Sequence, residues 1–493
     1  MKTLLLIAMT SIASAGNNVL LIIADDFGTD SHSLYNTDAG ATAPTPNINA
    51  LANDGVRFTN AYSTPVCSPA RACMLTGRFG FRTGVGEVVS VASGNSLPSS
   101  ELTLPEVIAQ NSGLGIQSAC FGKWHLNAGS PTITANGPNT IGGWPHYAGC
   151  TAGALASYTS WTKTVNGMTS TVTTYATTDT VNDAVAWISA RETAKQPWVA
   201  WVAFNAPHTP FHVPPTNLHG YGANPATNLL KYRAAVEAMD TEIGRLLQSV
   251  DATKTDVIFI GDNGTPSQVI QAPHVATHAK DTLYDGGIHV PLIIRGPSVI
   301  DGGRTSEALV HAVDLFSTML EMAGVPLPSA VTLDSKSLMP ILSNQSSTRT
   351  RIYAEQFDQN SPSSGGRAIR DDRYKLIRFN NGSDGFYDLL NDPGETSNLL
   401  ASGIPSMDPT HKARYYRLRF NLGAYNTNQA SSTLSHHISA DGFSVTVSEN
   451  PGATQTMWQS ADLDFWEPVA EIMLDFRDGN FTFTTPLPLV EKR

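Results

Sequence analysis

Short runs of apolar residues alternate along the chain with segments in which apolar residues recur at steps of three and four. Five runs predict buried strands, at Val19–Ala24, Ile116–Phe121, Trp198–Phe204, Asp256–Ile260 and Val290–Ile294. Helical periodicity is clearest between Leu229 and Leu246, and it also marks Asp179–Thr193 and Ala312–Met322. This alternation predicts an α/β sheet with helices on both faces.

Polar residues directly follow four of these runs. Asp25 and Asp26 follow the first, and three further clusters follow the next runs at 122–125 (Gly-Lys-Trp-His), 205–208 (Asn-Ala-Pro-His) and 261–264 (Gly-Asp-Asn-Gly). In open α/β sheets, ligands gather beyond the carboxyl ends of the strands. We therefore expect the four clusters to converge at one edge of the sheet.

Four residues in these clusters, Asp25, Asp26, Asp262 and Asn263, offer hard oxygen donors. Such donors select calcium or magnesium over zinc, so they predict a divalent cation site. Calcium is favoured and magnesium is the alternative, because four protein oxygens suit a larger, less hydrated ion. Each pair alone would also fit a helix cap or an ordinary turn.

The segment 67–78, Cys-Ser-Pro-Ala-Arg-Ala-Cys-Met-Leu-Thr-Gly-Arg, predicts a cysteine at the start of a helix. Ser68 is a good N-cap, Pro69 suits the first helical position and Gly77 suits the end. Unpaired N–H groups and the helix dipole favour an anion beside Cys67. A cysteine phosphatase is excluded, because its loop arginine stands six positions after the cysteine, where this chain has Cys73. The alternative for Cys67 is a buried thiol or half of a disulfide.

The pattern C-x-P-x-R at 67–71, continued by L-T-G-R at 75–78, resembles the type I sulfatases of the alkaline phosphatase superfamily. Matching segments run from Val19 to about Leu400. The resemblance implies a large mixed, mostly parallel sheet sandwiched by helices, with a smaller C-terminal antiparallel α+β subdomain. It also implies that a formylglycine-generating enzyme oxidises Cys67 to formylglycine, whose hydrated aldehyde supplies the nucleophilic oxygen.

Two further segments resemble the family closely. The segment 122–125 implies that Lys123 and His125 face the substrate, while Trp124 packs on the other side. The segment 207–211, Pro-His-Thr-Pro-Phe, implies that His208 touches the sulfate ester.

A third segment, at 280–291, resembles the family pattern K-x-x-x-Y-E-G-G-x-R-V-P, with two departures. Lys280 is present, but Asp285 stands where Glu is usual and His289 where Arg is usual. These departures put local packing or a substrate contact in doubt more than the chemistry. His274 and His278, just upstream, are additional and are either leaving-group contacts or exposed histidines.

The resemblance implies covalent catalysis of sulfate ester hydrolysis. The sulfuryl oxygens would be neutralised by the cation and by Arg71, Lys123 and Lys280. Either His208 or Lys280 would protonate the leaving alcohol. His125 would act as the base when the second hydroxyl of the hydrate expels sulfate. The implied catalytic residues are Cys67, Arg71, Lys123, His125, His208 and Lys280; Lys123, His208 and Lys280 also bind substrate; the metal ligands are Asp25, Asp26, Cys67, Asp262 and Asn263.

Composition and charge limit the classes of molecule that we expect the chain to bind. The 493 residues are 41% hydrophobic and 15% charged, which suits a large globular core, and the net charge is −11. An acidic chain argues against nucleic acid and anionic membranes, and requires a local basic pocket for an anionic substrate. Trp144, His146 and Tyr147 are either walls of that pocket or packing residues. We expect an aryl or carbohydrate sulfate as substrate.

Residues 1–15 combine Lys2, an apolar run and the ending Ala13-Ser14-Ala15, which is typical of a cleaved secretory signal. We therefore expect a periplasmic or secreted protein, and no segment is long and apolar enough to span a membrane. In that compartment Cys120 and Cys150 form a disulfide or remain buried thiols.

The predicted organisation is a signal peptide (1–15), a catalytic α/β domain (16–350), a C-terminal antiparallel subdomain (351–405) and an extension (406–493) that includes a small β appendage. Two other functions remain open at this point. One is a phosphonate monoester hydrolase or phosphodiesterase of the same superfamily, and the other is a non-catalytic anion-binding protein with unmodified Cys67.

Overall fold

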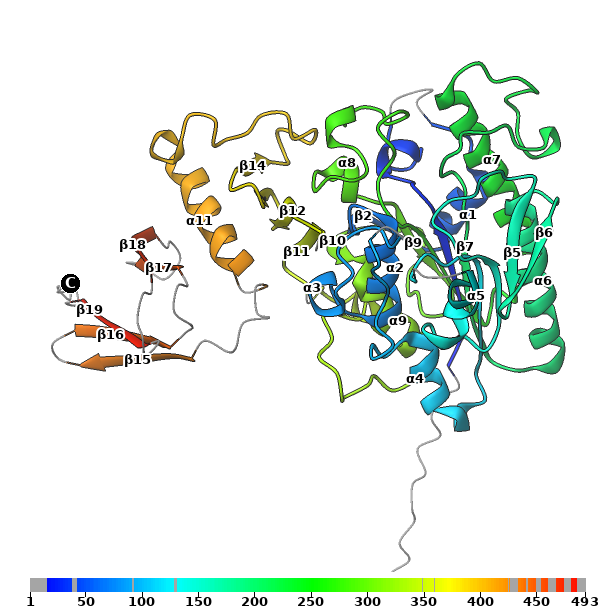
Figure 1. Ribbon diagram of the computed structural model, residues 1–493, viewed down its shortest axis with the longest axis horizontal. Coiled ribbons are helices and arrows are strands. Elements are labelled where there is room, and N and C mark those ends of the chain that lie inside the picture. Colours follow the sequence, from blue (N-terminus) through cyan, green and yellow to red (C-terminus); the bar gives the residue numbers. More distant parts are fainter. Residues whose placement is uncertain are drawn as a thin grey trace, which may run out of the picture.

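The computed structural model describes residues 16–37, 42–90, 93–127, 131–347, 349–358, 360–423 and 425, and the backbone of five strands beyond residue 430. The expected signal peptide, residues 1–15, lies outside the described residues. Two regular units follow one another along the chain, a large α/β domain and a small antiparallel sheet (Figure 1).

The α/β domain is built on a ten-stranded sheet with the order β10-β2-β9-β8-β1-β7-β3-β4-β5-β6. Strands β8, β1, β7, β3 and β4 run parallel to one another, whereas β9 and the β5–β6 hairpin are antiparallel to their neighbours. The strands are β1 (Asn18–Ala24), β2 (Val56–Tyr62), β3 (Gln117–Lys123), β4 (Tyr147–Cys150), β5 (Trp161–Val165), β6 (Met168–Val172), β7 (Trp198–Ala203), β8 (Thr255–Gly261), β9 (Leu292–Arg295) and β10 (Arg304–His311). The five strands expected from the apolar runs are all present.

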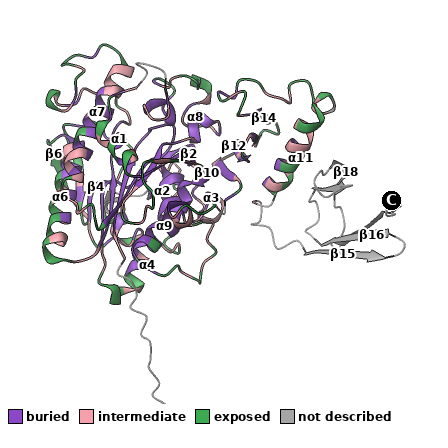
Figure 2. Ribbon diagram, turned by 180° about the vertical axis from the view of Figure 1, so that it is seen from behind, coloured by how far each residue is buried: buried purple, intermediate pink, exposed green. Residues whose placement is uncertain are grey.

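Helices cover both faces of this sheet, and the buried strands run between them (Figure 2). Alternate residues of β1 point to opposite sides. Leu21 and its odd-numbered neighbours pack with helices α2, α4 and α9, whereas Leu20 and its even-numbered neighbours pack with α1, α6 and α7. The helices are α1 (Pro46–Asn53), α2 (Cys67–Thr76), α3 (Gly80–Thr83), α4 (Leu104–Gln110), α5 (Pro131–Thr140), α6 (Ala176–Ala194), α7 (Asn228–Leu247), α8 (Asp285–Ile288), α9 (Leu315–Met322) and α10 (Met339–Leu342). The three helices expected from periodicity are among them.

The second unit is a four-stranded antiparallel sheet of β11 (Ile352–Asp358), β12 (Ser361–Arg370), β13 (Tyr374–Phe379) and β14 (Asp384–Asp388). Helix α11 (Pro409–Gly423), which the expected boundary at 405 leaves out, packs Tyr415 and Leu418 against the buried face of this sheet. The C-terminal strands are β15 (Thr433–Ser439), β16 (Gly442–Ser448), β17 (Thr454–Gln459), β18 (Glu467–Met473) and β19 (Asn480–Thr485), which pair in a three-stranded and a two-stranded sheet.

The four cysteines are buried and free, so the disulfide between Cys120 and Cys150 does not form. Strand β4 pairs with β3 so that Cys120 lies opposite Tyr147 and Cys150 lies opposite Lys123. The two cysteines are therefore about 10 Å apart along neighbouring strands, beyond the reach of a disulfide. Within the described part of the chain, no helix has both the length and the apolar character needed to cross a membrane.

Candidate active site

Cys67 is the first residue of helix α2, at the carboxyl edge of the sheet. The expected N-cap at Ser68 is wrong by two residues, because the cap is Val66, which is extended and precedes the helix. Ser68 is not free to cap, since its Oγ donates to the carbonyl oxygen of His125 at 2.9 Å and accepts from the backbone N of Val89 at 3.0 Å. Gly77 ends the helix in the left-handed conformation, as expected.

Arg71, one turn further along α2, joins the ends of three strands. Its guanidinium donates to Oδ2 of Asp262 at 2.7 Å and to the carbonyl oxygen of Lys123 at 2.9 Å, and it lies 3.8 Å from Oδ1 of Asp25. The ammonium group of Lys123 in turn contacts Oδ2 of Asp25 at 2.6 Å. All four side chains are fully buried. Burial opposes the charge on Arg71 and Lys123, but the neighbouring carboxylates raise the pKa of both side chains, so both stay protonated.

Lys280 and Asn263 complete the cluster on the side of Asp26. Lys280 Nζ lies 2.6 Å from Oδ1 of Asp26, and the side-chain amide of Asn263 donates to the same oxygen at 2.9 Å. Burial would raise the pKa of Asp26, but His208, Lys280 and Lys123 together lower it. The pKa of Asp262 is raised to about 6, by burial and by the like charge of Asp25.

His125 connects the cysteine to the next loop. Its Nδ1 lies 3.1 Å from Sγ of Cys67, and its Nε2 lies 3.0 Å from the carbonyl oxygen of Val89. A carbonyl oxygen only accepts, so Nε2 carries the proton and Nδ1 faces the cysteine as an acceptor. Burial, together with Lys123 and Arg71, holds the pKa of His125 well below its usual range. Burial raises the pKa of Cys67, against the effect of Lys123 and Lys280.

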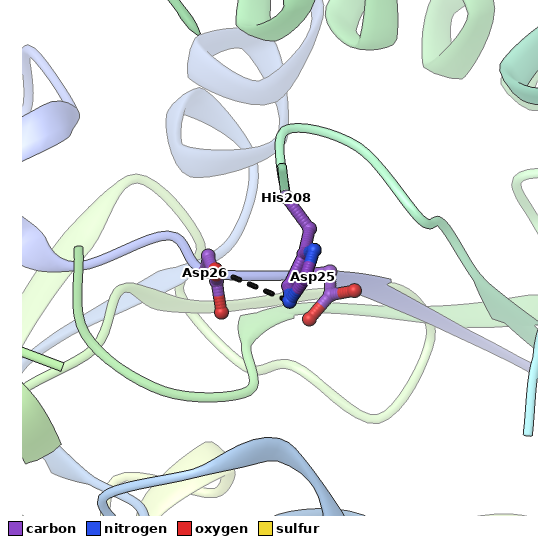
Figure 3. Close-up of side chains that lie close together, drawn as sticks. All are labelled: Asp25, Asp26 and His208. Carbon is purple, nitrogen blue, oxygen red and sulfur yellow. Dashed lines mark ion pairs between the residues drawn. The ribbon is translucent and has the colours of Figure 1, made fainter. Parts of the chain in front are cut away.

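His208 reaches from the loop after β7 toward the two aspartates, with Nε2 3.7 Å from Oδ2 of Asp26 (Figure 3). Its Nδ1 lies 2.8 Å from the carbonyl oxygen of Thr209, which directs Nε2 toward the cluster. Asp25, Asp26 and His208 bring three potential metal-ligand atoms within 4.8 Å of one another. The expected convergence of four strand ends is thus confirmed.

One residue of this site was missed from the sequence. The hydroxyl of Tyr158 lies 2.5 Å from the carbonyl oxygen of Asn205 and 2.8 Å from that of His208, so it fixes the loop that carries His208. Tyr158 lies in a Ser/Thr-rich stretch without periodicity, and no signal in the sequence marks it.

The aromatic residues proposed as walls mostly pack. Trp144 and Tyr147 are fully buried in the core, and Trp124 also packs there, as expected from its position between Lys123 and His125. His278 stacks on Tyr284 with ring centroids 3.6 Å apart.

Comparison of the whole chain with known proteins identifies its family. A model of the sulfatase family matches residues 17–325, and a model described as "N-sulphoglucosamine sulphohydrolase, C-terminal" matches residues 275–414. The chain belongs to the sulfatase family.

Relatives of this sulfatase extend the comparison over most of its length. It is 29% identical to arylsulfatase G of Rattus norvegicus, over 74% of this chain and 76% of the relative, and 29% identical to human arylsulfatase A, over 80% and 85%. Among solved structures, Ps i-CgsB in complex with k-i-k-neocarrahexaose matches with a TM-score of 0.72 and 23% identity, covering 84% of this chain and 93% of the other. The large mixed sheet with a small antiparallel subdomain is therefore the sulfatase fold, and the sulfatase is an enzyme of the alkaline phosphatase superfamily.

Proposed function

We propose that this sulfatase hydrolyses carbohydrate sulfate monoesters with a formylglycine nucleophile made from Cys67 and with a bound divalent cation. The observation that carries the proposal is the position of Cys67, which begins helix α2 and contacts His125 beside the buried cations Arg71 and Lys123. An anionic sulfuryl group placed there would be held by fixed positive charge away from water.

The residues present fit an oxygen-ligated cation. Asp25, Asp26 and Asp262 are buried carboxylates within one cluster, and Oδ1 of Asp25 and Oδ1 of Asn263 are buried without a hydrogen-bond partner. Buried oxygens of this kind normally have a partner, so a cation satisfies them. We assign Asp25, Asp26, Asp262, Asn263 and the modified side chain 67 as its ligands, with calcium favoured over magnesium. When bound, the cation supplies positive charge to the sulfuryl oxygens.

The remaining residues hold and protonate the substrate. Lys123 and Lys280, fixed by Asp25 and Asp26, bind sulfuryl oxygens together with Arg71. His208 lies at the more open side of the cluster, where its Nε2 can protonate the departing alcohol. His125, with Nδ1 toward residue 67, accepts a proton from the hydroxyl group of the hydrated aldehyde.

We favour carbohydrate sulfates as the substrate class because two relatives of similar sequence identity have names that refer to saccharides. The chain is 27% identical to the ulvan-active sulfatase of Formosa agariphila and 27% identical to the N-acetylgalactosamine-6-sulfatase of Canis lupus familiaris. Arylsulfatases are equally similar, so aryl sulfates belong in the same assay.

Two measurements test the proposal. The mass of the peptide containing residue 67, from protein made with and without a formylglycine-generating enzyme, should show the aldehyde and the thiol respectively, and only the former protein should release sulfate. Hydrolysis of sulfated sugars, aryl sulfate, a phosphonate monoester and a phosphodiester should be fastest for a sulfate ester and absent in Cys67→Ala. Faster hydrolysis of the phosphonate or the phosphodiester would favour the alternative activity.

We also propose that the protein is exported to the periplasm or secreted. The basis is the sequence of residues 1–15. N-terminal sequencing of the protein from its own host should begin after Ala15, and an intact Met1 in a cytoplasmic fraction would contradict export.

A further inference from the structure

A cavity of about 380 Å³ lies between the α/β domain and the antiparallel subdomain, and none of its lining residues belongs to the candidate active site. One wall contains Asp285 and His289, the two positions at which the chain departs from the family segment. Both side chains are shorter than the Glu and Arg usual there, which leaves space beside them. The subdomain contributes Arg370, Asp372 and Leu390 to the lining.

The cavity contains a buried polar group that nothing in the described chain satisfies. His274 lines the cavity and is only 8% exposed, and its Nδ1 has no hydrogen-bond partner. Burial lowers the pKa of His274 to about 4, so the ring is neutral near pH 7. A buried polar atom normally has a partner, and the described chain supplies none to this neutral imidazole.

His289 offers a second open position. Its Nε2 lies 2.8 Å from the carbonyl oxygen of Thr59 and therefore carries the proton, which leaves Nδ1 as an acceptor. That Nδ1 is 3.8 Å from Oδ2 of Asp285, too far for a hydrogen bond. The ring stacks on Tyr62 with centroids 4.7 Å apart, so its orientation is fixed.

The positive charge in the cavity wall is the guanidinium group of Arg370, which already donates hydrogen bonds to the protein. Arg370 donates from Nε to the carbonyl oxygen of Asp371 at 2.8 Å, from one terminal nitrogen to the hydroxyl of Tyr62, and from the other to the carbonyl oxygen of Asp372 at 3.0 Å. A sulfate or phosphate would need that guanidinium fork. It would also face the carboxylate of Asp372, so an anion does not suit this cavity.

The geometry points to a neutral saccharide as the ligand of this cavity. Its hydroxyl groups can donate to His289 Nδ1 and to the Asp372 carboxylate. The apolar C–H faces of a sugar ring match the walls formed by Leu34, Leu389 and Leu390, the last of which is 71% exposed at the mouth. The volume of about 380 Å³ lies within the range of small-molecule sites. On a sulfated polysaccharide the cavity would hold an unsulfated part of the chain, and this consequence alone rests on the proposed function.

Binding of unsulfated disaccharides to the full-length protein tests the inference without catalysis. Lactose, cellobiose and maltose are titrated by calorimetry and by saturation-transfer NMR, with inorganic sulfate and 4-nitrophenyl sulfate as competitors. We expect at least one disaccharide to bind in the millimolar range and neither competitor to displace it. Absence of binding, or displacement by 4-nitrophenyl sulfate, would overturn the separate site while leaving the proposed sulfatase chemistry untouched.

Two variants locate the bound disaccharide. Asp372→Ala, on an exposed side chain, should raise the Kd by about two- to tenfold through loss of one hydrogen-bond acceptor. His289→Arg should fill the cavity and abolish binding. Asp54→Ala, at a carboxylate that is 74% exposed and outside the cavity, is the matched control and should leave the Kd unchanged. An unchanged Kd in Asp372→Ala would place the disaccharide elsewhere and overturn the inference.

Discussion

Arg71 is the residue on which the charge balance of the active site depends. It is fully buried and contacts Asp262, Asp25 and the carbonyl oxygen of Lys123. Arg71→Ala leaves the buried carboxylate of Asp262 without its cation partner, while Asp25 keeps Lys123. Loss of one partner of a buried pair costs about 3–5 kcal/mol of unfolding free energy. We expect that loss in urea denaturation, together with loss of sulfate ester hydrolysis.

Arg71→Lys is the control for this prediction. It keeps the charge but loses the planar fork that contacts two acceptors at once, so it should recover part of the stability and little of the activity. If Arg71→Ala were as stable as the wild type, the arginine would not balance these carboxylates.

The buried carboxyl group of Glu355, outside the active site, should make the unfolding free energy depend on pH. This buried carboxyl accepts from the backbone N of Phe81 and from the hydroxyl of Tyr353, and burial raises its pKa from 4.5 to about 7. The folded state therefore holds the proton more tightly than the unfolded state does. Its contribution to stability is present below about pH 4.5 and is lost as the pH rises to about 7, by up to about 3 kcal/mol.

Glu355→Gln should remove this contribution from the pH profile of unfolding free energy. The measurement is urea denaturation between pH 4.5 and pH 7.5, with the exposed Glu307→Gln as control. The wild type and the control should lose stability over this range by about 3 kcal/mol more than Glu355→Gln does. Parallel profiles for all three proteins would show that Glu355 does not titrate as described.

At the level of elements, the sequence predicts the strands that are buried on both faces and misses elements that are only partly buried. β1, β3, β7 and β8 are almost entirely buried, and their ends fall within two residues of the expected ones. β2 (Val56–Tyr62) includes Arg57, Thr59 and Asn60, which are only half-buried, so its apolar signal is weak. The sequence does not predict helix α11 for the same reason, because few of its residues are buried and it is rich in arginine and tyrosine.

One buried lysine links the two units by ion pairs. Lys375 of β13 contacts Oδ1 of Asp285 at 2.7 Å and Oε1 of Glu395 at 2.8 Å, and all three are buried. Lys375→Met would leave two buried carboxylates unpaired, and we expect it to lower the unfolding free energy by about 3–5 kcal/mol. Lys254→Met, which breaks an exposed pair with Asp251, is the matched control and should leave the unfolding free energy nearly unchanged. Equal effects in urea denaturation would contradict a buried clamp.

At the scale of the whole molecule, the sequence predicts the site only through the rule that ligands bind beyond the carboxyl ends of parallel strands. The sequence shows that Asp25, Lys123, His208 and Asp262 follow strands, and parallel strands bring their carboxyl ends to one edge. It does not show which side chains pair across that edge. The pairing of Lys123 with Asp25, and the support of His208 by Tyr158, depend on strand order and loop packing that no local pattern encodes.

Burial of several like charges in one place should couple cation binding to the stability of the entire domain. Asp25, Asp26 and Asp262 come from the ends of neighbouring strands β1 and β8, so a cation bound between them stabilises only the folded chain. A ligand at 100 times its Kd adds about 2.7 kcal/mol to the unfolding free energy. After dialysis against EDTA, we expect calcium to raise the Tm and to restore sulfate ester hydrolysis, and magnesium to raise the Tm less. The shift should be largely lost in Asp262→Asn and kept in the exposed control Asp54→Asn. If calcium raised the Tm of Asp262→Asn as much as that of the wild type, the ion would be binding elsewhere and this cluster would not be the metal site.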